Sequence, residues 1–203
     1  MLDPLPIGFD APSHTYWWQP TGEQMVWSVS EVVKPMTEAN RIWLEKHPEY
    51  AERGTAIHAV LEQFLKGEEV EHPQEYTEWT DKLLFDSWWD DVDEVLALEH
   101  RLADPGKGIG GSFDGLVRRG GETWIYDLKT KSSKDTARPK PYAQLGGYSR
   151  MLEKHYKTMP DKGLVIWSWP GGCKFEDMDI DKCLAKWEQA YEAHEAREAV
   201  NCI

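Results

Sequence analysis

The middle of this chain is a run of predicted strands, with helix-forming segments on both sides of it. Apolar periodicity predicts three successive strands, and the dipeptide Gly120-Gly121 joins the second strand to the third as a tight hairpin. A helix and a fourth strand come next, in the order helix, three meandering strands, helix, strand. The strands are predicted at 95–99, 112–118, 122–129 and 163–169, and the flanking helices at 52–66 and 141–153. This order predicts an α/β fold, a three-layer α/β/α sandwich around one mixed sheet.

Shorter elements are predicted at both ends. A hairpin at 14–29, a short helix capped by Ser28 or Ser30 and a helix at 37–46 precede this αβββαβ core. The remaining predictions are an acidic helix at about 74–90, a short strand at 175–180 and a C-terminal helix at 181–200. A length of 203 residues suits one domain. We expect 52–169 to be its core, with 1–50 as an N-terminal embellishment and 170–203 as a C-terminal extension.

Negative charge is concentrated in one part of the chain. The formal net charge is −13, and the stretch from Glu68 to Glu99 holds twelve acids and a single base, Lys82. The net charge argues against a protein that coats DNA through its phosphates. Outside this stretch the chain is nearly neutral. Two interpretations of region 68–94 stay open: a solvated helix face, or a docking surface for a basic partner protein.

The cysteines and the hydropathy pattern bear on the compartment. The spacing of Cys173, Cys183 and Cys202 matches neither a zinc site nor a disulfide framework, so reduced thiols are expected. No apolar run is long enough to cross a membrane, and residues 1–10 lack the pattern of a secretory signal. These features predict a cytoplasmic protein without a membrane partner.

Two carboxylates and a lysine are the first candidates for chemistry. Strand periodicity places Asp127 and Lys129 on one face of the sheet, with Leu128 turned into the core. The hairpin brings Asp114 beside Asp127, and a divalent cation between them would relieve their repulsion. The alternatives are an ordinary surface ion pair for Asp127 and Lys129, and a turn aspartate for Asp114.

Two helices contribute further candidates. His58 lies at the edge of the apolar stripe of the 52–66 helix, where it either faces a cleft or is a satisfied core histidine. Gln144 and Tyr148 are one helical turn apart and project from one face. Such a pair can grip a phosphate oxygen or a lysine, or simply pack between helices.

The order Gly-x-x-x-His, Gly-x-x-Asp, Asp-x-Lys, Gln-x-x-x-Tyr resembles the RecB-like branch of the PD-(D/E)xK nucleases, over roughly residues 52 to 169. This branch includes CRISPR-associated RecB-type, phage and mitochondrial genome maintenance exonucleases, and the resemblance implies a restriction-endonuclease-like core. It also implies hydrolysis of DNA with Mg²⁺ or Mn²⁺. His58, Asp114, Asp127 and the Leu128 carbonyl would be metal ligands, with Glu99 as a further candidate.

In the same resemblance, Lys129 would be the catalytic lysine, with Gln144 and Tyr148 positioning substrate or that lysine. Phe113 replaces the proline of the family's name, as is common in this branch. The members with an iron–sulfur cluster need four cysteines, one of them upstream of the core. This chain has none before Cys173, so no cluster is expected.

Substrate contacts are expected from a basic loop and from aromatic residues. The loop carries Lys131, Lys134, Arg138 and Lys140, which either track a nucleic-acid backbone or are solvated. Trp17 and Trp18 either stack on unpaired bases or cover an apolar face. A nearly neutral body with local positive charge favours an exonuclease that engages a few nucleotides at a strand end. The resemblance implies that the substrate is DNA and that the role is in phage or bacterial replication, recombination or repair. The alternatives are a structure- or sequence-specific endonuclease, and a non-catalytic nucleic-acid-binding or adaptor protein.

Overall fold

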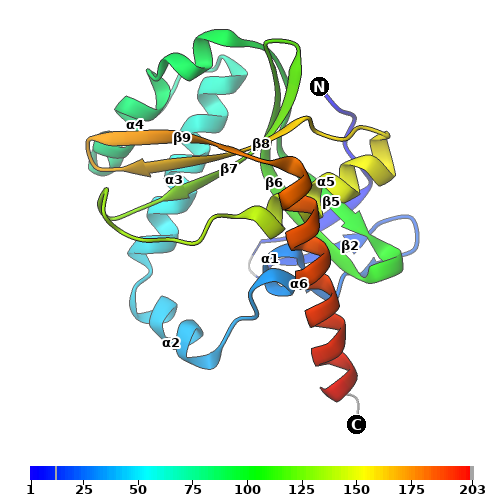
Figure 1. The fold of residues 1–203 in the computed structure, drawn as a ribbon. Coiled ribbons are helices and arrows are strands. Elements are labelled where there is room, and N and C mark those ends of the chain that lie inside the picture. Colours follow the sequence, from blue (N-terminus) through cyan, green and yellow to red (C-terminus); the bar gives the residue numbers. More distant parts are fainter. Residues whose placement is uncertain (12, 202–203) are drawn as a thin grey trace.

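The computed structural model describes residues 1–11 and 13–201, and in this part of the chain a six-stranded mixed sheet forms the centre of the fold (Figure 1). Its members are β4 (Trp27–Ser28), β5 (Val92–Asp104), β6 (Ile109–Arg119), β7 (Glu122–Thr130), β8 (Lys162–Trp169) and β9 (Gly172–Met178). β5, β6 and β7 form an antiparallel meander, β8 runs parallel to β7, and β9 returns antiparallel to β8. The short β4 pairs parallel with the start of β6.

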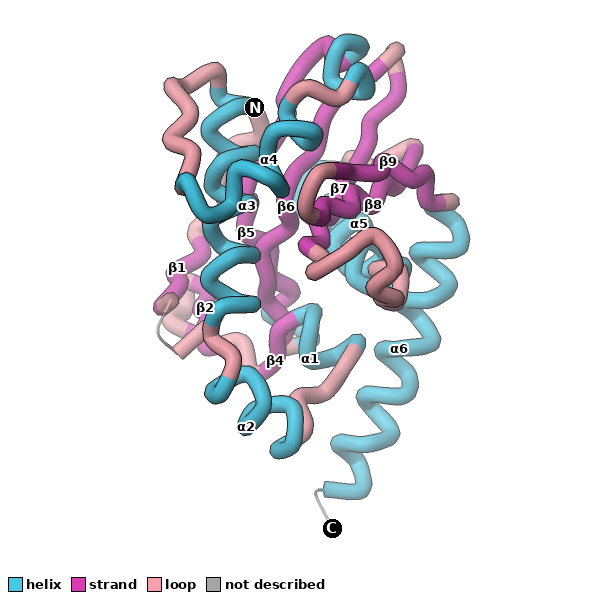
Figure 2. The backbone as a smooth tube through the Cα atoms, turned by 90° about the vertical axis from the view of Figure 1, so that its left-hand side faces the viewer, coloured by secondary structure: helices cyan, strands magenta, loops and turns pink. Residues whose placement is uncertain are grey.

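Helices cover both faces of this sheet (Figure 2). On one face, α3 (Glu49–Lys66) and α4 (Thr77–Leu84) pack against alternate strand residues such as Tyr126 and Leu128. On the other face, Ile125 and Val165 pack in the cluster that includes residues of α1 (Val29–Val33), α5 (Tyr142–Tyr156) and α6 (Ile180–Asn201). The predicted three-layer α/β/α sandwich is confirmed, because both faces of the sheet are apolar and both are covered.

The N-terminal part forms a small sheet of its own. β1 (Ile7–Asp10) pairs antiparallel with β2 (Thr15–Trp18), which pairs with β3 (Glu23–Gln24). The hairpin of β2 and β3 agrees with the sequence prediction, whereas β1 was not predicted. A helix follows at α1, and its cap is Ser28, whose side chain accepts from the backbone N–H of Glu31.

The helix α2 (Glu38–Lys46) agrees with the predicted segment, beginning after its N-cap Thr37. No residue of α2 is buried. The views in Figures 1 and 2 place α2 at the edge of the molecule, away from the sheet.

Three predicted elements have wrong bounds. The short strand expected at 175–180 is β9, which begins and ends earlier. The acidic segment 74–90 is not one helix, because α4 is flanked by the 3₁₀ turns Gln74–Tyr76 and Ser87–Asp91. The second turn lets Trp88 stack on Phe175 of β9, and the Asp86 side chain accepts from the backbone N–H of Trp88. The strand predicted at 95–99 is the much longer β5, which pairs along the whole of β6 and shortens the glycine-rich turn to 105–108.

The candidate site lies where β6 and β7 separate. Their pairing ends at Gly115 opposite Tyr126, and from Asp127 onward β7 pairs only with β8. Asp114 and Asp127 are therefore the first residues beyond the last pair, where the two strands separate.

Cys173 and Cys183 are free thiols, and Cys202 lies outside the described residues. In the part of the chain that the structure describes, no helix combines the length and the apolar character needed to span a membrane.

Candidate active site

Asp114 bridges the gap between the separating strands. Its Oδ2 accepts a hydrogen bond from the backbone N–H of Leu128, 2.6 Å away. This contact replaces the strand-to-strand pairing that ends one residue earlier, and it ties Asp114 to the strand of Asp127. The residue that follows Asp114 must be a glycine, Gly115, because a Cβ at this position would lie 2.3 Å from the Tyr126 ring.

His58 reaches the same place from α3. Its Nε2 lies 3.0 Å from the carbonyl oxygen of Leu128. A carbonyl only accepts, so Nε2 is the donor. The other ring nitrogen, Nδ1, lies 3.5 Å from Glu99 Oε1 and 3.6 Å from Asp114 Oδ1. The helix thus brings a nitrogen ligand to two carboxylates carried by the sheet.

Glu99 completes this group from β5. It lies between the pairs Leu98–Gly115 and His100–Phe113, and hence opposite Asp114. Its backbone φ is +42°, in the left-handed region that side chains other than glycine rarely adopt. This strained backbone lies in the middle of a cluster of polar groups, as is common at functional sites.

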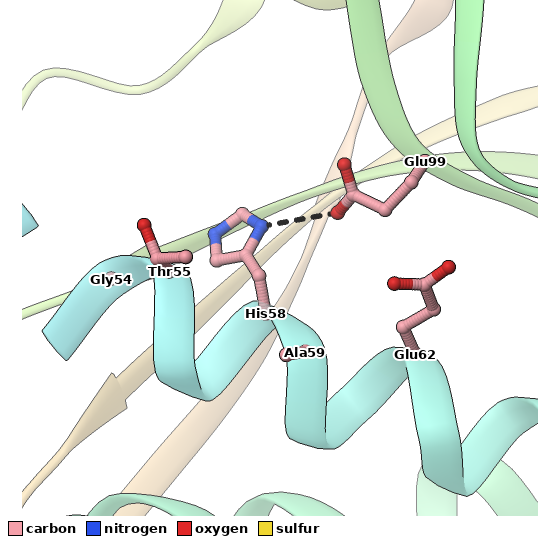
Figure 3. A pocket seen from close by; sticks show the side chains of 6 residues that line it. All are labelled: Gly54, Thr55, His58, Ala59, Glu62 and Glu99. Atoms are coloured by element: carbon pink, nitrogen blue, oxygen red, sulfur yellow. Dashed lines mark ion pairs between the residues drawn. The ribbon is translucent and has the colours of Figure 1, made fainter. Parts of the chain in front are cut away.

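The three side chains fit a divalent cation. One ligand atom from each of His58, Glu99 and Asp114 lies within 4.8 Å of the others. Imidazole and carboxylate donors suit divalent metal ions. The cluster opens into a cavity of about 420 Å³, where the side chains of His58 and Glu99 point toward one another (Figure 3). The cavity is lined by Gly54, Thr55, His58, Ala59, Glu62 and Glu99.

Asp127 and Lys129 form an ion pair next to this cluster. Both carboxylate oxygens of Asp127 lie 2.9 Å from Lys129 Nζ, and Oδ1 accepts a hydrogen bond from it. The buried Oδ2 makes no hydrogen bond with the described residues, although the Lys129 ammonium lies 2.9 Å from it. Lys129 compensates part of the negative charge of this buried carboxylate, and a divalent cation could use the lone pairs that remain on Oδ2.

The charges of these groups shift one another's pKa. Burial raises the pKa of Asp127 to about 6 and also raises that of Asp114. Burial alone would lower the pKa of His58, but the Asp114 and Glu99 carboxylates outweigh it and raise this pKa to about 9. Burial would likewise lower the pKa of Lys129, but Asp127 and Asp114 raise it. Lys129 is therefore a permanent cation at neutral pH.

The family model of the PD-(D/E)XK nuclease superfamily matches residues 31–201. The chain belongs to this superfamily. PD-(D/E)XK nucleases cleave nucleic acids with divalent metal ions, and the His58, Glu99 and Asp114 cluster provides a possible metal site for that chemistry. The mixed sheet and its flanking helices agree with the restriction-endonuclease-like fold of the superfamily.

One solved structure that is similar is described as "Crystal structure of SSO0001", at 17% sequence identity and a TM-score of 0.39. The match covers 82% of this chain and 75% of that one. The search of curated proteins found no match.

In this PD-(D/E)XK chain, Gln144 and Tyr148 lie on α5 but point to different neighbours. Gln144 Nε2 donates to Ser30 Oγ, 3.0 Å away on α1. Tyr148 is buried and lies close against Gly111, where a Cβ would be 2.9 Å from the Tyr148 hydroxyl. The structure therefore shows packing and helix-to-helix contacts for both residues, and their positioning roles stay predictions.

The basic loop and the tryptophans are separated in space. Lys131, Lys134, Arg138 and Lys140 line one cavity beyond the end of β7. Trp17 lies over Gly8 of the N-terminal sheet, and the ring of Trp18 packs on His155. Both tryptophans thus have packing contacts, Trp17 within the N-terminal sheet and Trp18 with α5, and the structure does not bring them together with the His58 cluster.

The sequence analysis did not identify the two other polar residues of the cavity, Thr55 and Glu62. Glu62 lies one helical turn after His58 on α3 and forms an ion pair with Lys66 at 2.8 Å. The i, i+4 spacing of His58 and Glu62 was the signal that could have identified it.

Proposed function

We propose that this chain is a Mg²⁺- or Mn²⁺-dependent DNA exonuclease of the RecB-like branch, which hydrolyses phosphodiester bonds from a free end. The observation that carries the proposal is the His58, Glu99 and Asp114 cluster beside the ion pair of Asp127 and Lys129. Such a group can bind a cation and a phosphate at one place. A role in phage or bacterial replication, recombination or repair, and a cytoplasmic location, are part of the same proposal.

The residues have distinct tasks in this proposal. His58, Glu99, Asp114 and Asp127 would hold the cation, and the Leu128 carbonyl has a second lone pair besides the one facing His58. A divalent cation supplies Lewis acidity and lowers the pKa of bound water. Lys129 keeps its proton, because its pKa is raised, so it would stabilise negative charge on the phosphate rather than act as a base.

The charge distribution supports an exonuclease over an endonuclease. With a net charge of −13, the chain has little capacity to hold a long duplex, whereas one local basic loop suffices for a few nucleotides. We propose that no iron–sulfur cluster is present, since the chain has no cysteine before Cys173.

A cleavage assay tests this function. End-labelled linear DNA and closed circular DNA are incubated with Mg²⁺, Mn²⁺ or EDTA. We expect metal-dependent loss of linear DNA, abolished by Asp127→Ala and by Lys129→Ala, while Lys186→Ala on α6 behaves as wild type. Cleavage of closed circles would favour the structure- or sequence-specific endonuclease. Cleavage that survives both Asp127→Ala and Lys129→Ala would contradict the assignment of the active site to these residues.

A protein partner is proposed for the acidic region 68–94. Exposed acids there include Glu75, Glu78 and Asp81, which lie on or next to α4. A basic recombination or replication protein fits this charge. The triple variant Glu75→Gln/Glu78→Gln/Asp81→Asn should lose salt-sensitive binding to such a protein and keep nuclease activity. Binding of DNA or of the partner by a chain that never cleaves would support the non-catalytic adaptor instead.

A further inference from the structure

A row of side chains crosses the sheet from the candidate active site to a second cavity. Lys129 of β7 is in register with Trp167 of β8, which is in register with Lys174 of β9. Residues in register on neighbouring strands share a face of the sheet. Lys129, Trp167 and Lys174 therefore lie side by side on the face that α5 covers elsewhere.

The cavity at the end of this row has a volume of about 390 Å³, within the range of ligand-binding pockets. It lies between β8, β9 and the loop that follows β7. Its lining includes five basic residues and only two acidic ones, so its net charge is +3 in a protein whose net charge is −13. The charged lining residues are Lys131, Lys134, Arg138, Lys140, Lys174, Asp135 and Glu176.

Glu176 neutralises only part of this positive charge. It pairs with Lys140 at 2.6 Å and with Lys174 at 3.6 Å, and it accepts from the Trp167 indole N–H at 3.1 Å. These contacts hold Trp167 and Lys174 in place. Three other basic side chains on the loop provide the remaining positive charge.

Two tryptophans form the apolar wall of the cavity. Trp167 and Trp169 are two residues apart on β8 and both line it. The ammonium of Lys131 lies 5.5 Å from the centroid of each ring. A cation next to two aromatic rings is a setting in which a base can stack on a ring while its phosphate meets a positive charge.

Trp167 connects this cavity to the active site. It lines the cavity, and it is in register with Lys129 on the neighbouring strand. Arg138, also in the lining, adds a positive charge there. A strand whose phosphate lies at Lys129 can thus continue past Trp167 into the cavity.

We propose that this cavity binds unpaired nucleotides of the DNA strand next to the bond that is cut, with a base on Trp169 and Trp167 and phosphates on the basic side chains. The inference rests on the proposed nuclease function and names its substrate class, single-stranded DNA or a frayed end. In a duplex the base faces are covered by stacking and the edges are paired, so a duplex cannot use the tryptophan wall.

Binding in EDTA tests the proposal apart from cleavage, since no metal is present. The probes are a fluorescently labelled oligo(dT) and a blunt DNA hairpin of equal charge, read by anisotropy. We expect oligo(dT) to bind more tightly than the hairpin, and Trp169→Ala to weaken it about tenfold, the usual size of one lost stacking contact. Trp169→Phe keeps a ring and should retain most of the affinity. Phe85→Ala, at an exposed aromatic residue outside the cavity, is the matched control.

Lysine variants test the charged half of the cavity even if Trp169→Ala fails to fold. For Lys134→Ala and Lys174→Ala, the dependence of log affinity on log salt should become shallower by about 0.7 for each substitution. Lys186→Ala should leave this slope unchanged. Equal binding of the hairpin and oligo(dT), or wild-type behaviour of Trp169→Ala and both lysine variants, would overturn the proposal. Loss of cleavage in Lys129→Ala with oligo(dT) binding retained would support the cavity as a binding site that is distinct from the residues that cleave.

Discussion

The Nε2 atom of His58 lies 3.0 Å from the carbonyl oxygen of Leu128, the residue between Asp127 and Lys129. This hydrogen bond joins α3 to β7 and fixes which ring nitrogen carries a proton. In the neutral ring the unprotonated nitrogen is then Nδ1, which faces Glu99 and Asp114. A hydrogen bond from the far nitrogen is how proteins orient a metal-binding histidine.

Replacing His58 should change which metals bind. In His58→Ala the site would keep only oxygen donors, and imidazole contributes most to binding of metals such as Ni²⁺. We expect Ni²⁺ affinity to fall by about tenfold or more, and Mg²⁺ affinity to fall less. Isothermal titration of both metals measures this, with His47→Ala on the exposed end of α2 as the control. Equal losses for Ni²⁺ and Mg²⁺ would argue against His58 as a ligand.

Metal affinity should also depend on pH through His58. The Asp114 and Glu99 carboxylates outweigh burial and raise the pKa of His58 to about 9 in the metal-free protein. At pH 7 the ring is therefore protonated, and a cation must displace one proton. Mn²⁺ affinity should rise by about tenfold per pH unit from pH 7 until it levels off near pH 9. His58→Ala should lose this slope, and a slope that survives the substitution would contradict the prediction.

The same histidine should make the stability of the metal-free protein depend on pH. Its pKa is raised above the value of about 6.5 in an unfolded chain, so its charged form stabilises the fold. That contribution is complete below pH 6.5 and is lost as the pH rises through about 9, by at most about 3 kcal/mol. Urea unfolding in EDTA at pH 6.5 and at pH 9.5 should show a larger decrease for wild type than for His58→Gln. An equal decrease in the two proteins would contradict it.

The positive φ of Glu99 predicts that Glu99→Gly and Glu99→Ala differ in stability but not in their loss of metal affinity. Glycine adopts this conformation without steric cost, so Glu99→Gly should be more stable than Glu99→Ala, by about 1 kcal/mol. Both variants should lose metal affinity, because both remove the carboxylate. Urea unfolding and Mn²⁺ titration of the pair separate the two effects. A Glu99→Gly variant less stable than Glu99→Ala would mean that the backbone relaxes when the side chain is removed.

Local patterns were enough to predict much of the fold. Period-two alternation placed Leu128 in the core and left Asp127 and Lys129 together on the other face, where the structure has them as an ion pair. The hairpin at Gly120-Gly121 brought Asp114 near Asp127 because short turns fix the pairing of their strands. These elements depend on neighbouring residues, which a sequence displays directly.

The features of the fold and of the site that the sequence did not predict depend on contacts between residues that are far apart in the chain. The position of Glu99 opposite Asp114 follows from a register shift between Val95 and Ala97 and from a left-handed backbone, neither of which has a local sequence signal. The tryptophan wall is similar, since Trp167 lies beside Lys129 only through parallel pairing of β7 and β8 across the intervening helix. Stacking by Trp17 and Trp18 is predicted from residue type alone, and in the structure Trp17 packs over Gly8 and Trp18 against His155 of α5.

Gly54 provides a test in which stability and activity should move in opposite directions. It lies in the helix α3 and lines the cavity of His58, and a Cβ there would have no neighbour within 4 Å. Alanine is the better helix former, so Gly54→Ala should raise the free energy of unfolding by roughly 0.5–1 kcal/mol. We expect cleavage to fall nonetheless, because the added methyl group takes space in the cavity that the DNA backbone would approach. Urea unfolding and the rate of loss of end-labelled DNA measure the two effects, and a more stable variant that cleaves as fast as wild type would place the substrate elsewhere.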